Sequence, residues 1–445
     1  MSFFSFLAPA RAKDLIEDRE QINRDYKYWR IRIFYSIYFG YAAFYLTRKS
    51  VTFALPFIEK DLGFTKAQLG FLATVLYLSY GFSKFVSSIA SDQSNPRYFM
   101  ALSLIATGIF NIAFSFSSSL FLFALFWLLN GIAQGGGWPP VAKQLTFWFT
   151  QKERGAWWSF ATTAHNFGGG LIPLIITGIA QAYNWRTAIS ITGGFSILIG
   201  FWLMNRMRDK PESLGLPAVE VYKNDLEAIA KTKQQEKSEN ADFKKLLFKE
   251  ILVNRGVWML ALSYFFVYVL RTAFNDWGVF YLMGTRDYSP VTASLTITCF
   301  EIGGFLGVLA AGFASDYIFK GRRIPYMIYS TGFLALGLLI FLANPYQHFT
   351  LDCLLMGLLG FLIFGPQLLV GLASSEFVPK KVACTANGFA GLFAYLGAAF
   401  TGYPLGKVID KWSWQGFFLV LSVCISLNFI LLFFLNTNLF KSKDH

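Results

Sequence analysis

The sequence predicts an all-α polytopic membrane protein in which twelve transmembrane helices form two pseudo-twofold six-helix bundles. Apolar segments longer than about 18 residues, the length that a transmembrane helix requires, recur throughout the 445-residue chain. The composition is 55% hydrophobic and 19% aromatic with only 15% charged residues, whereas a soluble domain carries about a quarter charged residues. The two halves of the chain also repeat the same polar features. Together these observations exclude a soluble globular domain.

Twelve spans are predicted, split six and six by the longest polar segment. They lie near residues 31–58, 67–90, 97–117, 119–148, 155–183, 187–206, 255–283, 290–315, 325–344, 350–377, 382–409 and 414–437. The expected organisation is a cytoplasmic N-terminal segment at 1–30, an N-terminal bundle at 31–206, a cytoplasmic linker at 207–254, a C-terminal bundle at 255–437 and a cytoplasmic tail at 438–445.

The distribution of lysine and arginine predicts the orientation of the chain. Cations concentrate in residues 1–30, 95–97, 151–154, the central linker, 320–323, 379–381 and 441–443. These segments alternate with loops that hold few cations, which places both termini in the cytoplasm of a multi-pass protein of the plasma membrane. The net charge of +13 therefore indicates membrane orientation and not a nucleic-acid partner. The polar N-terminus lacks the apolar core of a cleavable signal peptide, so the first span should act as an uncleaved signal.

A short motif repeats after the second span of each half. Residues 91–92 are Ser-Asp and are followed by Arg97, and the same pair at 315–316 is followed by Arg322 and Arg323. Two six-span halves that share such a loop are typical of an internally duplicated transporter.

Two arginines interrupt apolar spans at matching places in the two halves. Arg48 lies in the first span, and Arg271 lies 223 residues later in the seventh. A charge at bilayer depth costs roughly 2.5–3.5 kcal/mol on insertion scales, so such a residue indicates function. Each guanidinium presents a planar fork, and two facing forks suit one phosphoryl dianion. The alternative is that each arginine snorkels or pairs locally, with Asp276 a possible partner of Arg271.

Four further ionisable residues lie inside spans. Lys84 either adds positive potential to a central cavity or pairs with the buried acid Glu301. His165, which precedes a glycine run, can donate a hydrogen bond to a phosphate or change charge as the substrate arrives; the alternative is that it bonds a backbone carbonyl. Glu301 and Lys49 are candidates for a charge partner or for coupling, and a proton-carrying role of Glu301 or His165 stays open.

The glycine-rich run at residues 134–140 breaks the fourth span. It lacks the GxxxxGK[ST] pattern and lies in an apolar helix, so it predicts a kink beside the cavity and not a nucleotide loop. The sequence shows no nucleophile elbow, no paired-histidine motif and no metal-ligand cluster. We therefore expect no enzymatic activity, no nucleotide, no metal and no prosthetic group.

Spaced motifs across almost the whole chain resemble the organophosphate:phosphate antiporters of the major facilitator superfamily. They lie at residues 39–50, 80–85, 91–97, 138–140, 151–155, 164–166, 214–217 and 364–367. The resemblance implies the major facilitator fold. It also implies that Arg48 and Arg271 bind the phosphate and that Lys84 and His165 line the same cavity. By the same similarity, the other candidate substrate-binding residues are Tyr41, Tyr45, Trp138, Tyr268 and Tyr395.

Within that family the chain looks most like the hexose-phosphate sensor/transporter branch, on residues 157–158, 275–278 and 391–398. It departs from the glycerol-phosphate branch at Ala161 and Thr162, and from the dedicated hexose-phosphate carriers at Asn387 and Ala390. The resemblance implies a monomer in a bacterial inner membrane, with lipid around it, that exchanges a sugar phosphate such as glucose 6-phosphate for inorganic phosphate. The alternatives are a receptor that senses glucose 6-phosphate for a sensor kinase, a glycerol 3-phosphate:phosphate antiporter, and a proton-coupled carrier of another anion.

Overall fold

The structure is a computed structural model that describes residues 7–92, 94–224, 251–344, 348–378 and 383–441, and these residues form helices and connections without a strand. The N-terminal half contains α1 (Arg19–Leu62), α2 (Lys66–Asp92), α3 (Pro96–Ser115), α4 (Leu120–Gln134), α5 (Trp138–Trp148), α6 (Gln151–Thr162), α7 (Ala164–Ala182) and α8 (Trp185–Arg206), followed by the short η2 (Pro211–Leu214) and α9 (Val219–Tyr222). The C-terminal half contains α12 (Arg255–Thr285), α13 (Pro290–Phe313), the π-helical turn η4 (Ala314–Ile318), α14 (Arg323–Ala343), α15 (Phe349–Glu376), α16 (Ala383–Phe400) and α17 (Tyr403–Lys441).

Helices cover all twelve predicted spans, so the predicted all-α fold is confirmed. Nine helical stretches of the described chain are long and apolar enough to cross a membrane, and one of them, Ala386–Thr437, joins spans eleven and twelve. The backbone leaves helical geometry inside this stretch at Ser413, which separates the two spans. The remaining two spans are α1, which carries Arg48, and α6 with α7, which carries His165.

The kink predicted in the fourth span is a short break between α4 and α5, where the amides of Gly135, Gly136 and Gly137 bond carbonyls three residues back. Gly135 and Gly136 lie in this break, and a Cβ atom on either would collide with a serine hydroxyl, that of Ser83 or of Ser103. Only glycine therefore allows the chain to turn so close to α2 and α3. The fifth span is divided in the same way, because α6 ends at Thr162 and α7 begins at Ala164.

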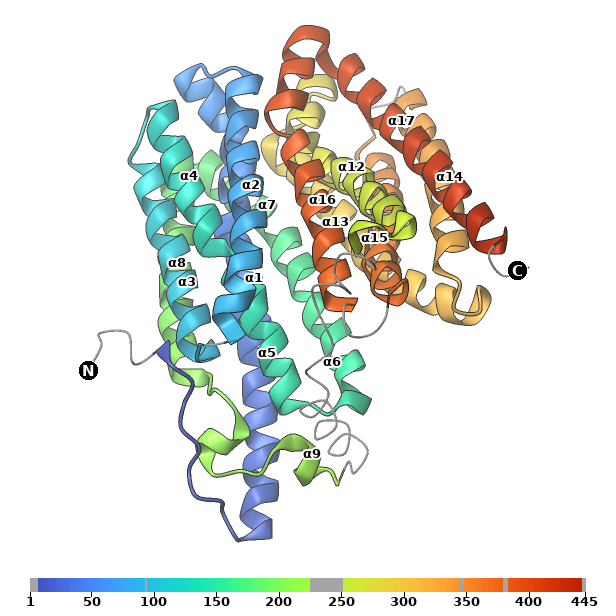
Figure 1. Cartoon of the computed structure of the whole chain (residues 1–445). Coiled ribbons are helices and arrows are strands. Elements are labelled where there is room, and N and C mark those ends of the chain that lie inside the picture. Colours follow the sequence, from blue (N-terminus) through green and yellow to red (C-terminus); the bar gives the residue numbers. More distant parts are fainter. Residues whose placement is uncertain (1–6, 93, 225–250, 345–347, 379–382, 442–445) are drawn as a thin grey trace.

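The two halves lie side by side and meet along two seams. In one seam α7 packs against α13, and in the other α2 packs against α16 and α17. Figure 1 shows the two halves in contact near the α1–α2 junction and diverging towards α6 and α9. At the α1–α2 junction the backbone amides of Lys66 and Ala67 donate to the carboxylate of Asp410 at 3.2 and 2.8 Å. Thr74 Oγ1 donates to the carbonyl of Ala399 at 2.9 Å. We call this end of the molecule the closed end.

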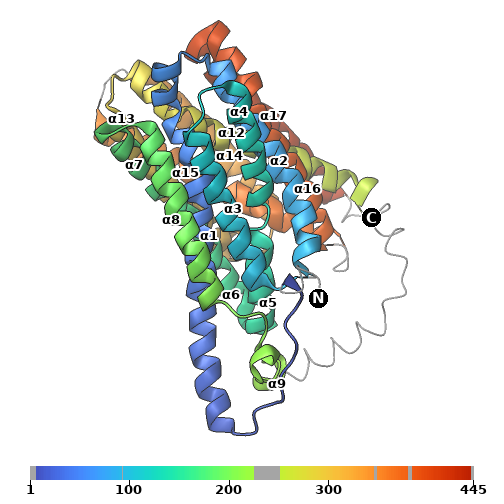
Figure 2. The same ribbon diagram turned by 90° about the vertical axis from the view of Figure 1, so that its left-hand side faces the viewer.

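The N-terminal boundaries differ from the predicted ones, because α1 begins at Arg19 and extends beyond the other helices of its half (Figure 2). Asp18 caps this extension by accepting a bond from the amide of Glu20 at 2.9 Å. The ring of Tyr26 stacks on Tyr222 with centroids 3.9 Å apart, and its hydroxyl donates to the carbonyl of Pro217. Burial, together with nearby glutamates, raises the pKa of Tyr26 above its ordinary value.

The first part of the predicted linker, residues 207–224, packs on the N-terminal half. Backbone bonds from Lys13 to Glu212 (2.9 Å) and from Ile16 to Gly215 (2.8 Å) join the N-terminal segment to it. Residues 225–250 of the linker lie outside the described residues, as do residues 379–381 and residues 442–445 of the predicted tail.

Candidate functional site

The polar end of α4 holds Arg48 in place within the N-terminal half. Arg48 is only 5% exposed, and its Nε donates to Oε1 of Gln134 at 3.0 Å. Gln134 is fixed in turn, because its Nε2 donates to the hydroxyl of Thr47 at 3.0 Å and to the carbonyl of Phe44 at 3.2 Å. Nη2 of Arg48 is buried and has no hydrogen-bond partner among the described residues. One edge of the guanidinium is thus anchored, and a second donor is left for a ligand.

Arg271 in α12 is held by aromatic rings. Its guanidinium carbon lies 4.6 Å from the ring centroid of Phe364 and 5.7 Å from that of Tyr268. Within the described part of the chain it has no hydrogen-bond or ion-pair partner. The alternative that Asp276 neutralises Arg271 is therefore wrong in this conformation.

Aromatic contacts connect the two arginines along one side of the site. The guanidinium of Arg48 lies 4.3 Å from the ring centroid of Tyr80 in α2. Tyr80 contacts Tyr395 of α16 at 4.9 Å between centroids, and Tyr395 contacts Tyr268 at 5.7 Å. Tyr268 then lies against Arg271.

A second series of contacts closes the ring on the other side. Arg48 lies 4.5 Å from the centroid of Tyr45, and Tyr45 lies 6.0 Å from the ring of His165. His165 is parallel to Phe364 at 6.2 Å, and Phe364 lies under Arg271. We call this closed set the arginine–aromatic ring: Arg48, Tyr80, Tyr395, Tyr268, Arg271, Phe364, His165 and Tyr45. Both halves contribute to it, so its shape depends on how the halves are docked.

The remaining predicted site residues border the ring. Nζ of Lys84 lies 5.4 Å from the ring centroid of Tyr395. Tyr41 lies between Tyr45, at 5.9 Å, and Trp138, at 5.0 Å. The structure therefore brings all nine predicted substrate-binding residues into one connected set.

Three members of the site were not among the predicted residues. They are Gln134, Tyr80 and Phe364. Tyr80 precedes Lys84 by one helical turn and so shares its face, which is a signal that the sequence contained. Phe364 carries no comparable signal, because one more phenylalanine in an apolar span is indistinguishable from a core residue.

His165 lies at the break between α6 and α7. Its Nδ1 is 2.5 Å from the carbonyl oxygen of Thr162, and its Nε2 is buried without a partner among the described residues. The bond to a backbone carbonyl is the one expected of a structural histidine, and it requires a hydrogen on Nδ1. Nε2 then accepts a hydrogen bond when the ring is neutral and donates one when the ring is protonated.

Lys49 forms an ion pair that joins the two halves. Its Nζ lies 2.6 Å from Oδ1 of Asp276, and the hydroxyl of Tyr77 donates to Oδ2 at 2.8 Å. The two charged side chains are only 10% and 3% exposed. This pairing makes Lys49, and not Arg271, the partner of Asp276.

Glu301 in α13 also bridges the halves, through neutral donors. It accepts from Nδ2 of Asn275 at 2.9 Å and, across the seam, from Nδ2 of Asn166 at 3.2 Å. These two amides are its partners in the described structure, so of the two alternatives for Lys84, this conformation does not show the one in which it pairs with Glu301.

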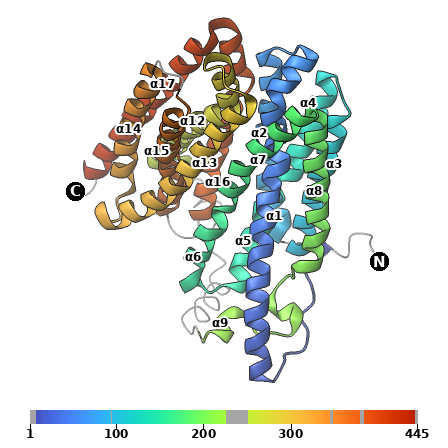
Figure 3. The ribbon, with the colours of Figure 1, turned by 180° about the vertical axis from the view of Figure 1, so that it is seen from behind.

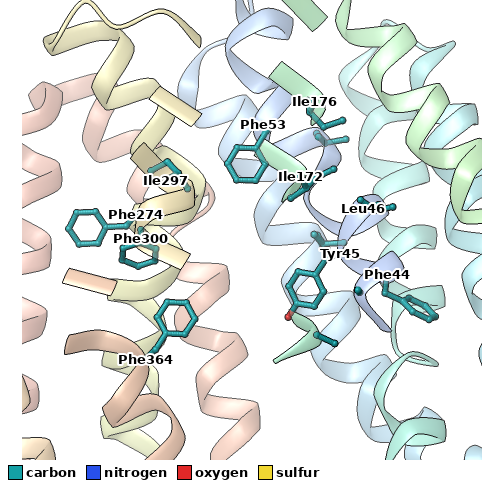
Figure 4. Close-up of a cluster of buried hydrophobic side chains, with 14 of the residues drawn as sticks. Phe44, Tyr45, Leu46, Phe53, Ile172, Ile176, Phe274, Ile297, Phe300 and Phe364 are labelled. Atoms are coloured by element: carbon teal, nitrogen blue, oxygen red, sulfur yellow. The ribbon is translucent and has the colours of Figure 1, made fainter. Parts of the chain in front are cut away.

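Hydrophobic side chains from both halves cover the site towards the closed end. Figure 4 shows Phe53 on one side and Ile297 and Phe300 on the other, with Tyr45 and Phe364 below them. Among the described residues there is no group of three or more His, Cys, Asp or Glu that could hold a metal ion.

Comparisons with known proteins agree with this architecture. Residues 37–402 match the model of the Major Facilitator Superfamily. The chain is 49% identical to a probable hexose phosphate transport protein of Chlamydia trachomatis, over 96% of this chain and 95% of that protein. It is 45% identical to the membrane sensor protein UhpC of Escherichia coli, over 96% and 97%. It is 36% identical to the glycerol-3-phosphate transporter of Bacillus subtilis, over 92% and 93%.

A solved structure shows the same fold. The structure of a bacterial homolog of the human lysosomal transporter Spinster, in an inward-facing and occupied conformation, aligns with a TM-score of 0.73 at 15% identity, over 92% of this chain and 97% of that chain. The resemblance found in the sequence motifs is confirmed. The chain is a multi-pass membrane protein of the organophosphate:phosphate antiporter family of the Major Facilitator Superfamily, whose members are transporters and not enzymes.

Proposed function

We propose that this protein exchanges a sugar phosphate, a hexose 6-phosphate such as glucose 6-phosphate, for inorganic phosphate by alternating access. The observation that carries the proposal is the arginine–aromatic ring, in which one arginine from each half meets a histidine. Arg48 Nη2 and His165 Nε2 are buried there, and neither has a hydrogen-bond partner among the residues that the structure describes. A buried charge without a counterion is costly, and a bound phosphate would compensate it.

The charge balance of the site favours an anion. Lys49 forms an ion pair with the carboxylate of Asp276, and two asparagine side-chain amides donate hydrogen bonds to the carboxylate of Glu301. Neither carboxylate therefore pairs with Arg48 or Arg271. Two guanidiniums can grip the oxygens of one phosphoryl group, and the fixed geometry of the fork makes the contact specific.

Apart from the cations Arg48, Arg271 and Lys84, the site is neutral and suits a sugar. The other ring members are aromatic, and four of them are tyrosines whose hydroxyls can bond sugar hydroxyls. Asn387 and Ala390 on α16 add no charge. The similarity to a protein named as a hexose phosphate transporter supports a hexose as the organic part.

The arrangement of the halves supports alternating access about a fixed site. The inter-half bonds at Asp410 and Thr74 hold the closed end together, and the ion pair of Lys49 lies between that end and the site. With both termini in the cytoplasm, as the cation distribution predicts, this conformation is inward-facing. Opening to the other side must then break the Lys49–Asp276 pair.

Signalling is the second candidate function, since a relative named as a membrane sensor protein is 45% identical. A receptor for glucose 6-phosphate that acts on a sensor kinase would need the same ring. A receptor and a transporter would bind the substrate in the same way, so a measurement of substrate flux across the membrane is needed to distinguish them.

Proteoliposomes that are preloaded with phosphate test the proposal directly. Uptake of labelled phosphate should proceed without a proton gradient and should be inhibited by glucose 6-phosphate more strongly than by glycerol 3-phosphate. Binding of glucose 6-phosphate without any flux would favour the receptor. A strict requirement for a proton gradient would favour coupling through Glu301 or His165, and preference for glycerol 3-phosphate would favour the glycerol-phosphate branch.

A further inference from the structure

An apolar groove lies on the outer side of the N-terminal half, away from the arginine–aromatic ring. It has a volume of about 740 Å³ and is lined by α1, α7 and α8, with Thr192 the only polar side chain among its lining residues. Figure 3 shows α1 between α7 and α8 on this face. Small residues, Ala42 and Ala43, form part of the lining and are buried, whereas Phe39 and Phe195 are about half exposed.

The length of the groove corresponds to one leaflet of a membrane. On α8 its lining extends from Ile191 to Trp202, which is about 16 Å at roughly 1.5 Å per residue. The hydrocarbon core of a bilayer is about 30 Å thick, so one leaflet supplies about 15 Å. In a membrane-spanning chain, an apolar groove of this length is in contact with lipid acyl chains.

Aromatic residues mark the end of the groove that lies towards the N-terminal segment. Trp202 lines the groove there and contacts Tyr35 of α1 with centroids 5.9 Å apart. Tyrosine and tryptophan prefer the level of the lipid headgroups. The groove therefore ends at the membrane–water interface.

Three arginines surround the C-terminal end of α8, one turn beyond Trp202. Arg32 donates to the carbonyls of Asn205 and Arg206, both at 3.3 Å. Arg208 donates to the carbonyls of Asn205 at 2.9 Å and Met207 at 2.7 Å. Within the described residues, none of Arg32, Arg206 and Arg208 pairs with a carboxylate. We call these three residues the arginine cluster.

A fourth arginine strengthens the positive charge at this place. Arg97, at the start of α3, donates to the carbonyl of Met204. Burial and the nearby positive charges of Arg97 and Arg32 lower the pKa of Arg208. Such mutual repulsion is relieved when an anion binds between the guanidiniums.

We propose that the groove binds one acyl chain of an anionic phospholipid, with the headgroup phosphate held by the arginine cluster. The apolar lining suits an acyl chain, and the guanidiniums one turn beyond it, which pair with no carboxylate among the described residues, suit a negative headgroup. A neutral lipid would leave the arginine cluster without a counterion. This site is separate from the arginine–aromatic ring and does not depend on the substrate.

Lipid in this groove would contact the helices that build the transport site. Gly168 lines the groove, and a Cβ atom on it would lie 2.7 Å from the carbonyl of Ala42 and 2.8 Å from Cβ of Tyr45. The backbones of α1 and α7 are therefore in close contact between the groove and Tyr45. An acyl chain packed there would stabilise the contact between α1 and α7.

Retention of lipid by the purified full-length protein tests the proposal. The protein in neutral detergent is titrated with phosphatidylglycerol or with phosphatidylcholine of the same acyl chains, and bound lipid is counted by native mass spectrometry. We expect phosphatidylglycerol to be retained at least tenfold more strongly and to raise the melting temperature. The double variant Arg206→Gln/Arg208→Gln should lose this preference, and Leu171→Trp, which fills the groove, should weaken retention while the arginines stay intact. Arg255→Gln, at an exposed arginine that begins α12 in the other half, is the matched control and should change nothing.

Two further measurements distinguish a bound phospholipid from other possible occupants of the groove. Inorganic phosphate at the same concentration should not displace phosphatidylglycerol, since it lacks the acyl chain. Equal retention of the two lipids by a monodisperse protein, unchanged in the double variant, would overturn the proposal. A species of two chains that disappears in Leu171→Trp would assign the groove to a second copy and would also overturn it.

Discussion

Gln134 and Arg48 are 86 residues apart in sequence, and their side chains are joined by a hydrogen bond of 3.0 Å between Oε1 and Nε. Gln134 is the last residue of α4, directly before the glycine break of the fourth span. The break thus brings a rigidly held amide against one edge of the guanidinium. We therefore expect Gln134 to be a positioning residue for the proposed phosphate site.

Gln134→Leu should weaken phosphate binding without preventing insertion of the protein. A hydrogen bond to a charged group contributes about 1.5–3 kcal/mol, so the apparent affinity should fall about ten- to a hundredfold. Counterflow of labelled phosphate at varied concentrations measures this change. Gln68→Leu, at a glutamine outside the site, is the control, and an unchanged affinity in Gln134→Leu would remove the positioning role.

Arg48→Lys and Arg271→Lys should each abolish exchange, or nearly so, while the protein still inserts. Lysine keeps the positive charge but loses the planar fork that holds two phosphate oxygens. Exchange in proteoliposomes and the yield of folded protein measure the two effects separately. Wild-type transport by either variant would exclude that arginine from the site.

His165→Gln should leave expression and melting temperature unchanged and should reduce turnover. Glutamine can keep one hydrogen bond near the carbonyl of Thr162 but cannot change its charge when substrate arrives. Turnover, substrate affinity and thermal unfolding are measured on the same preparation. Unfolding of the variant with normal affinity in the surviving fraction would show that His165 is structural.

Breaking the ion pair between Lys49 and Asp276 should destabilise the conformation that is sealed at the closed end. Removing one partner of a buried pair leaves an uncompensated charge, which typically costs about 3–5 kcal/mol. Lys49→Met and Asp276→Leu should therefore each lower the melting temperature more than the double variant does. A double-mutant cycle measures the coupling, and additive effects would contradict a direct interaction.

Glucose 6-phosphate should compete with phosphate exchange far below the concentration at which free glucose has any effect. Each bidentate contact that is lost with the phosphoryl group costs about 1.5–3 kcal/mol, so binding should weaken at least about a hundredfold. Inhibition curves for glucose 6-phosphate, inorganic phosphate and glucose test this expectation. Equal inhibition by free glucose is incompatible with the arginine–aromatic ring as a phosphate site.

The sequence alone determined the positions of the transmembrane spans, because the length of an apolar segment is a local property that each span displays by itself. It also located the ionisable residues of the candidate site, since a charged side chain is easily recognised in an apolar span. The repeat of the two halves further indicated that Arg48 and Arg271 occupy matching positions. The first residue of α1 could not be predicted from the sequence, because the part of the helix that extends beyond the membrane has no continuous apolar segment.

Only the tertiary structure decided which side chains meet. Asp276 follows Arg271 by five residues, which turns it by about 140° around the helix, so it faces Lys49 in the other half. Glu301 likewise meets two asparagines and not Lys84. These pairings depend on the rotation of each helix and on the docking of the halves, which are set by side-chain packing over the whole interface and not by any one segment.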